Sequence, residues 1–120
     1  MIFDTNILIY LSKNVLKPEV LFLEEASISV ITKIEALGFN FQNKEEHEII
    51  SGLCSLLHVV PVSDTIAEAT INLRKKYKIK LPDALIYATA LVQNQPLVTN
   101  NIGDFASLGN LVKLINPFTL

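Results

Sequence analysis

Apolar residues along the chain occur either as short continuous runs or at the spacing of one helix face. The continuous runs predict five strands, at residues 1–4, 27–31, 59–62, 97–99 and 111–115. The segments between them predict helices at residues 5–13, 18–25, 32–38, 43–57, 65–77 and 81–92. Because strands and helices alternate throughout, the sequence favours an α/β fold with a parallel sheet covered by helices.

Local signals mark the starts of three of these helices. Thr32 and Glu35 match the capping-box pattern, in which the Glu side chain returns to the backbone N–H of the capping residue. Asp64 is placed to cap the helix that begins at residue 65, and Pro82 suits the first turn of the next one.

Length and composition limit the class of protein. A chain of 120 residues, half of them hydrophobic, is expected to form one domain over residues 1–120. The only cysteine, Cys54, lies in an apolar stretch and is expected to be a buried thiol, which excludes an internal disulfide and a cysteine zinc site. No apolar run approaches the roughly 18 residues of a membrane span. We therefore expect a cytoplasmic protein with no membrane partner.

Four acidic residues stand where a carboxylate has little structural purpose. Asp4 ends the first apolar run, Glu35 follows the second, Asp83 heads the segment LPDALIYATA, and Asp104 closes TNNIGDF. An α/β protein gathers its strand ends along one sheet edge, so acids far apart in the sequence can meet there. Converged carboxylates repel one another and are costly to desolvate unless a cation neutralises them. The pattern therefore indicates a site for a hard divalent metal, which prefers oxygen ligands.

Each acid also has a structural interpretation. Asp4 could be the N-cap of the helix after it, and Glu35 could belong to the capping box. Asp83 would interact favourably with the dipole of its helix, and Asp104 lies among turn-forming residues after Gly103, which permits an unusual backbone. The shared position along one predicted sheet edge favours function for the set.

Polar neighbours of these acids are candidates for orienting a carboxylate or a substrate. Thr5 and Asn6 follow Asp4 directly. Thr99 and Asn101 add polar groups to the segment that contains Asp104.

The charge distribution bears on nucleic-acid binding. A net charge of −2 and a pI of about 5.6 argue against it when judged on totals alone. However, a strip just ahead of Asp83 contains Arg74, Lys75, Lys76, Lys78 and Lys80, half of the 10 Lys and Arg residues. This strip could hold phosphates beside an acidic metal pocket, or it could be a solvated helix end.

The ordered set of motifs resembles a known family. Asp4-Thr5-Asn6, Glu35, LPDALIYATA around Asp83 and TNNIGDF around Asp104 are similar to the PIN-domain ribonucleases, particularly the VapC-type toxins of toxin–antitoxin pairs. The resemblance spans nearly the whole chain. It implies a three-layer α/β/α sandwich with a central, mainly parallel five-stranded sheet. It also implies that the four acids bind Mg²⁺ or Mn²⁺ and support hydrolysis of RNA phosphodiester bonds, leaving 5′-phosphate and 3′-hydroxyl ends.

One segment departs from the family pattern. The family often has Arg or another polar residue at the place of Asn100, and a carboxylate or Asn at that of Asn101. The fourth position of the site could therefore be filled by Asp104 or partly by an amide, which leaves the number of bound metals, one or two, open.

The function expected from these features is a Mg²⁺- or Mn²⁺-dependent endoribonuclease that acts as the toxin of a type II toxin–antitoxin pair. Its partners would be an RNA substrate and a cognate antitoxin that covers the site and presents Arg or Lys to the acids. The alternative is a non-catalytic PIN-like module that binds RNA or a protein. A phosphotransfer receiver domain is disfavoured because receivers need paired acids near the start, where Asp4 stands alone.

Apolar residues at positions 7–11 and 20–23 exceed what one face of two short helices easily buries. The surplus could form a homodimer interface or a groove for a partner, or it could pack in the core.

Overall fold

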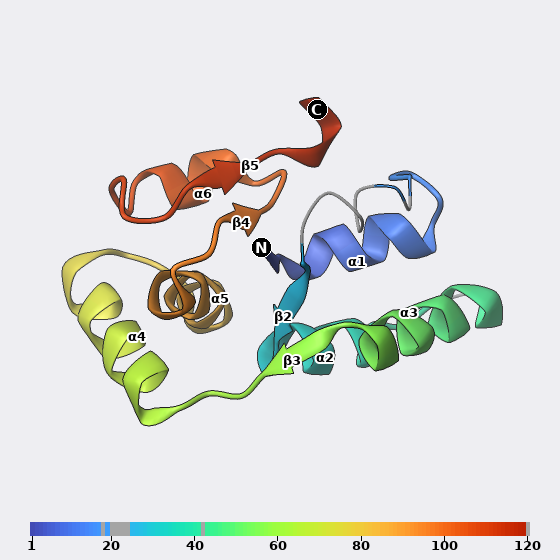
Figure 1. Cartoon of the computed structure of the whole chain (residues 1–120), viewed down its shortest axis with the longest axis horizontal. Coiled ribbons are helices and arrows are strands. Elements are labelled where there is room, and N and C mark those ends of the chain that lie inside the picture. The colour runs from blue at the N-terminus through green and yellow to red at the C-terminus, as the bar shows by residue number, and fades with distance from the viewer. Residues whose placement is uncertain (18, 20–24, 42, 120) are drawn as a thin grey trace.

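The structure, a computed structural model, describes residues 1–17, 19, 25–41 and 43–119. Strands and helices alternate along the described chain, as Figure 1 shows. The strands are β1 (Ile2–Phe3), β2 (Ser27–Ser29), β3 (His58–Val60), β4 (Leu97–Val98) and β5 (Leu114–Ile115). The helices are α1 (Thr5–Ser12), α2 (Val30–Leu37), α3 (Lys44–Leu56), α4 (Asp64–Lys76), α5 (Leu81–Gln93) and α6 (Ile102–Ala106), followed by the 3-10 helix η2 (Pro117–Thr119).

The strands form one five-stranded sheet in the order β3-β2-β1-β4-β5, and every neighbouring pair is parallel. Ile2 of β1 pairs with Ser27 on one side and with Leu97 on the other. The chain thus extends the sheet in one direction through β2 and β3 and then crosses back to place β4 against β1. Such a reversal opens a crevice at the carboxyl ends of the two strands where it occurs. The predicted parallel sheet is confirmed.

Helices cover both faces of this sheet (Figure 1). Successive strand residues point to opposite faces, so Phe3 and Val98 belong to a core shared with α1, α2 and α3. Ile2 and Leu97 belong to a second core, shared with α4, α5 and α6. The predicted three-layer α/β/α sandwich is confirmed. Cys54 is a buried free thiol in the first core, as the sequence predicted.

Two predicted helix starts were wrong because a serine just upstream provides the cap. Ser29 Oγ accepts a hydrogen bond of 3.1 Å from Ile31 N, so α2 begins at Val30 and the strand ends before it. Thr32 therefore lies inside the helix, and its capping box with Glu35 does not form. In the same way, Ser63 rather than Asp64 caps α4. Pro82 lies in the first turn of α5, as predicted.

The apolar surplus predicted at residues 7–11 is largely accounted for by the fold. Ile7, Leu8, Ile9 and Leu11 are all buried in the core of this chain. Ordinary core packing therefore explains α1, which removes that part of the argument for a dimer. The helix predicted at residues 18–25 and the apolar residues 20–23 fall mainly outside the described residues. Among the described helices, none is long and apolar enough to cross a membrane.

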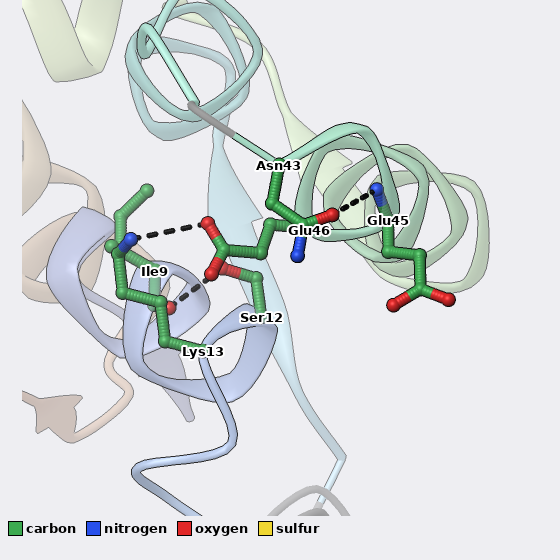
Figure 2. A network of polar contacts seen from close by, with 6 residues as sticks. All are labelled: Ile9, Ser12, Lys13, Asn43, Glu45 and Glu46. Atoms are coloured by element: carbon green, nitrogen blue, oxygen red, sulfur yellow. Dashed lines mark hydrogen bonds and ion pairs between the residues drawn. The ribbon is translucent and has the colours of Figure 1, made fainter.

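Polar contacts tie the end of α1 to α3 (Figure 2). Lys13 Nζ lies 3.1 Å from Glu46 Oε2, and the two side chains connect the two helices across a partly exposed surface. Ser12 Oγ donates to the carbonyl oxygen of Ile9, and Asn43 caps α3 by accepting from Glu45 N. The Lys13–Glu46 pair joins the two helices, whereas the Ser12 bond lies within the last turns of α1 and the Asn43 bond lies at the start of α3.

Candidate active site

Asp4 occupies the carboxyl end of β1, at the reversal point of the sheet. It is only 5% exposed, and both carboxylate oxygens accept hydrogen bonds. Thr5 N donates to Oδ1 at 2.8 Å, and Thr99 Oγ1, just beyond β4, donates to Oδ2 at 2.8 Å. Asp4 is the N-cap of α1, which the sequence left as an alternative to a role in the site. The capping role is confirmed, and the same carboxylate also lines a cleft, so a role in the site stays compatible with it.

Glu35 reaches this region from the exposed side of α2. Its Oε1 accepts a hydrogen bond of 2.7 Å from Thr5 Oγ1. The same Thr5 oxygen lies 3.2 Å from the hydroxyl of Thr32, which is fully buried one turn before Glu35. Glu35 is therefore held by the first turn of α1 rather than by the start of its own helix.

Asp83 comes from the first turn of α5, on the other side of Asp4. It is partly buried, and its carboxylate has no hydrogen-bond partner among the described residues. Lys80, at the N-cap position of the same helix, lowers the pKa of Asp83 and so favours its ionised form. It opposes the effect of burial and of the neighbouring acidic charges, which raise this pKa. Asp83 is thus the acid of this region with the fewest protein contacts to satisfy it.

Asp104 lies further out, in the short helix α6 rather than in the loop that the sequence predicted. Gly103 lies within that helix and has no positive φ, so the unusual backbone that a glycine permits is not used there. The exposed Asp104 carboxylate accepts a hydrogen bond of 2.9 Å from Asn101 Nδ2. Asn101 N in turn donates to Thr99 Oγ1 at 3.0 Å. A chain of contacts therefore links Asp104 through Asn101 and Thr99 to Asp4.

An open cleft of about 480 Å³ lies between these elements. Six of its lining residues were predicted site residues, namely Asp4, Thr5, Asn6, Glu35, Asp83 and Asn101. The sequence missed the other four, which are Ile9, Gly38, Phe39 and Asn40. Asp104 and Thr99 contact the lining residues without lining the cleft themselves. The structure thus brings three of the four acids into one cavity and leaves the fourth at its edge.

The electrostatics of the cleft follow from burial and from like charges. Burial raises the pKa of Asp4 above its ordinary value of 3.8, the hydrogen bonds from Thr99 and Thr5 oppose this, and the Asp83 and Glu35 charges add to it. The pKa of Asp83 is also raised, first by burial and then by the charges of Glu35 and Asp104. Bringing the carboxylates together therefore carries a free-energy cost that a cation would relieve.

The donor set of the cleft fits a hard divalent cation. The groups on offer are carboxylate, amide and hydroxyl oxygens, which suit Mg²⁺ and Mn²⁺. Within the part of the chain that the structure describes, no three Asp, Glu, His or Cys side chains are close enough together to enclose an ion directly. This is compatible with Mg²⁺, which usually keeps several waters and takes only one or two carboxylates from the protein.

The five residues of the basic strip are all exposed but have different surroundings. Lys80 stands beside Asp83 at the start of α5, close to the cleft. Lys76, by contrast, lies 5.4 Å from the Tyr77 ring centroid and lines a separate groove between α4 and α5. Arg74 donates a hydrogen bond to the carbonyl oxygen of Ile79, in the loop that follows α4. Lys75 and Lys78 are exposed. The position of Lys80 makes it the best placed of the five to meet a ligand in the cleft.

The cleft residues that the sequence analysis missed lie at the end of α2. Gly38 ends this helix, and Phe39 and Asn40 follow it as exposed residues in the cleft wall. In the sequence, the only sign of these site residues is a glycine that can end a helix, followed by an aromatic residue and an asparagine. That signal is weak without the spatial arrangement, because the hydrophobic pattern assigns an aromatic residue to the core.

Comparisons with known proteins agree with this fold. The chain is 34% identical to a toxin–antitoxin complex from Klebsiella pneumoniae, over 97% of this chain and 96% of that one, with a TM-score of 0.76. It is 26% identical to VapBC-1 from nontypeable Haemophilus influenzae, over 98% and 99% of the two chains, with a TM-score of 0.77. The DNA-bound VapBC from Salmonella typhimurium shares the fold, with 22% identity over 97% and 96% and a TM-score of 0.82.

A comparison with curated protein sequences finds no significant match. The model of the PIN-domain family, however, matches residues 1–111, which is most of the chain. The chain therefore belongs to the PIN-domain family, as its sequence motifs predicted.

Proposed function

We propose that the protein is a Mg²⁺- or Mn²⁺-dependent endoribonuclease and the toxin of a type II toxin–antitoxin pair. The observation that carries this proposal is the convergence of Asp4, Glu35 and Asp83, from three different elements, on one open cleft. Burial first, and then the repulsion between the acidic side chains, raises the pKa values of Asp4 and Asp83, and both effects make the cleft a place that favours a bound cation.

The residues divide the work of holding the metal. Asp4 and Asp83 would be its principal ligands, Glu35, held by Thr5, would add a third carboxylate, and Asp104, held by Asn101, would contribute from the edge of the cleft. When bound, Mg²⁺ or Mn²⁺ lowers the pKa of water and neutralises charge on the phosphate. Thr99 fixes Asp4 so that this carboxylate stays in place while substrate and product exchange.

The attacking group is water, because the cleft lining contains no Cys, Ser or His among the described residues. The Thr5 hydroxyl is engaged by Glu35 at 2.7 Å and is therefore a positioning group rather than a nucleophile. Lys80, beside Asp83, attracts the phosphate backbone to a cleft that would otherwise repel it. Hydrolysis then leaves 5′-phosphate and 3′-hydroxyl ends.

The assignment as a toxin rests on relatives. The Klebsiella pneumoniae and Haemophilus influenzae structures are toxin–antitoxin complexes that cover nearly the whole of this chain. An antitoxin with an Arg or Lys near its end would satisfy the unpaired Asp83 carboxylate and exclude RNA from the cleft. A homodimer stays a prediction from the sequence.

The second candidate is a PIN-like module that binds RNA or protein without cleaving it. One observation favours it: within the described residues, no three potential ligands enclose a single metal position. A cleft that attracts cations could serve such a module by binding an Arg or Lys of a partner.

Cleavage by the purified protein and by single-amide variants decides between the two. Asp4→Asn and Asp83→Asn should each lower Mg²⁺- or Mn²⁺-dependent RNA cleavage by at least about 100-fold, because the amide keeps the shape but removes a charge the metal needs. Asp64→Asn changes an exposed acid at the start of α4 and is the matched control. Growth inhibition on expression should disappear together with cleavage.

Cleavage by Asp4→Asn or Asp83→Asn at the parent's rate, with contaminating nucleases excluded, would refute the mechanism. A parent protein that cleaves no RNA with either metal, yet binds RNA or a partner protein tightly, would establish the binding module instead.

A further inference from the structure

An exposed aromatic ring stands in the wall of the carboxylate cleft. Phe39 is 45% exposed although it is a large apolar residue, and it lines the cleft together with Asp4 and Glu35. Its neighbour Asn40 is also exposed and lines the same cavity. The Asn40 amide has no hydrogen-bond partner among the described residues. The proposed metal chemistry uses neither side chain, so both need another explanation.

The surrounding structure holds the ring in place. Phe39 and Phe41 have centroids 4.8 Å apart with a tilt of 60°, and Phe41 is packed against the core. Lys13 Nζ lies 5.8 Å from both ring centroids and is itself fixed by the ion pair with Glu46 shown in Figure 2. An aromatic side chain that is already ordered loses little conformational freedom when a ligand packs on it.

The backbone also fixes where the ring can be. Gly38 N donates to the carbonyl oxygen of Ile34 at 2.9 Å, and Phe39 N donates to that of Ala36 at 3.3 Å. A Cβ at Gly38 would lie only 2.9 Å from the Ile34 carbonyl oxygen, so any larger residue would displace this turn. The end of α2 thus sets Phe39 and Asn40 at a defined place beside the carboxylates.

We propose that Phe39 and Asn40 form a nucleobase subsite, in which a base next to the scissile phosphate stacks on the Phe39 ring and the Asn40 amide pairs with the base edge. This inference rests on the proposed function, since it assigns a part of the same cleft to the RNA substrate. A nucleobase has a flat π-face and an edge of donors and acceptors, which matches a ring beside a free amide. An apolar protein side chain that packed on the ring and covered the Asn40 amide would remove that amide from water without a partner, at a free-energy cost.

The two residues have different consequences for recognition. Stacking on an aromatic ring is tolerant of sequence because every base has a π-face. Hydrogen bonds to an amide depend on which donors and acceptors the base presents. Phe39 therefore contributes affinity for any unpaired base, and Asn40 sets the preference among bases.

The test compares RNA with an oligomer that carries the same phosphates and no bases. Dissociation constants are measured in Ca²⁺ for the four single-base hexaribonucleotides and for an abasic hexamer, with intact RNA verified on a gel. Phe39→Leu should weaken binding of the base-containing oligomers by roughly tenfold and leave the abasic hexamer unchanged. Phe39→Tyr should retain the affinity.

Two variants sharpen the comparison. Phe118→Leu removes a ring of similar exposure, 44%, that packs on Tyr10 outside the cleft lining, and it should bind all five oligomers as the parent does. Asn40→Ala should reduce the ratio of dissociation constants between the weakest-bound and the tightest-bound single-base hexamer by roughly fivefold.

The subsite is overturned if Phe39→Leu binds the base-containing oligomers as tightly as the parent does. It is also overturned if the affinity of Phe39→Leu for the abasic hexamer falls by the same factor as its affinity for the base-containing oligomers. A parent that treats the two kinds of oligomer alike, or binds neither, also overturns it. Cleavage in Mg²⁺ is scored separately, so the nuclease can stand without the subsite. Unchanged RNA affinity with weaker binding of the antitoxin would assign the ring to the protein interface instead.

Discussion

Thr5 Oγ1 lies 2.7 Å from Glu35 Oε1 and 3.2 Å from Thr32 Oγ1, which places one hydroxyl between a carboxylate and a buried second hydroxyl. A hydroxyl has only one proton to donate, and the shorter contact to the carboxylate takes it. The Thr32 hydroxyl must therefore donate to Thr5. The resulting chain from Thr32 through Thr5 to Glu35 points Glu35 at the cleft without using a charged partner.

Thr5→Val should therefore weaken the metal site while preserving the fold. Loss of the hydroxyl frees Glu35, and changes to groups that orient a metal ligand cost roughly 10–100-fold in metal affinity or activity. The measurement is the Mg²⁺ concentration for half-maximal RNA cleavage, with the melting temperature recorded on the same preparation. Thr65→Val, at an exposed position of α4, is the control. An unchanged Mg²⁺ dependence in Thr5→Val would show that Glu35 does not need this support.

Binding of Mg²⁺ or Mn²⁺ should raise the melting temperature of the parent protein. A ligand that binds only the folded state at ten times its Kd adds about 1.4 kcal/mol, which is roughly 5 °C for a domain of this size. Asp83→Asn should lose most of this increase, because it removes the carboxylate that the protein itself satisfies least. Differential scanning fluorimetry across a metal titration measures both. If the metal raised the melting temperatures of the parent and of Asp83→Asn equally, the metal would have to bind at a site without Asp83.

The raised pKa of Asp83 predicts how stability depends on pH in the absence of metal. A carboxyl whose pKa is higher in the folded state binds protons more tightly there than in the unfolded chain. Stability should therefore fall as pH rises from the ordinary value of 3.8 through the raised pKa. Asp83→Asn should remove this loss and be more stable than the parent at neutral pH in EDTA, with the difference vanishing in acid.

Urea unfolding at a series of pH values measures this dependence. Asp83 suits the experiment better than Asp4. Both carboxylate oxygens of Asp4 accept hydrogen bonds, and an amide at that position could accept only one of them. A parent that is more stable than Asp83→Asn at neutral pH without metal would contradict the burial and repulsion that raise the pKa of Asp83.

The sequence predicted the layers of the fold because the spacing of apolar residues within each short segment indicates a strand or a helix. Ile2 and Phe3 illustrate this, since two consecutive apolar residues serve two opposite cores. The errors arose where two residues competed for one local role. Ser29 and Thr32 are both good caps and both are fully buried, and Ser29 is the cap because β2 ends there, with an extended backbone and a hydroxyl that accepts from Ile31 N.

The site was predictable as far as the acids follow strand ends. Asp4 follows β1 directly and lines the cleft, whereas Asp83 follows no strand and reaches the cleft from the first turn of α5, where its LPDALIYATA motif had marked it. The contacts that complete the site cross long distances in the sequence. Thr99 is 95 residues from Asp4, and Phe39 reaches the cleft only because α2 ends at Gly38. No local pattern encodes such meetings.

Lys80 and Lys76 should differ in their contribution to RNA binding, although the sequence places them in one strip. Lys80 lies beside Asp83 at the cleft, whereas Lys76 packs near the Tyr77 ring in a groove between α4 and α5. Each phosphate contact that is lost should reduce the slope of log affinity against log salt by about 0.7 for a single strand. Lys80→Gln should show this reduction, and Lys76→Gln should show little.

The quadruple replacement of Lys75, Lys76, Lys78 and Lys80 by Gln tests the whole strip, and it should weaken RNA binding while leaving metal binding nearly intact. Affinities measured from about 50 to 200 mM salt give the slopes, and a metal titration by calorimetry gives the control. If the quadruple variant kept the parent's slope, the strip would be a solvated surface. If Lys76→Gln lost as much slope as Lys80→Gln, the RNA would have to extend from the cleft across α4, because Lys76 has no other route to a strand held at Asp83.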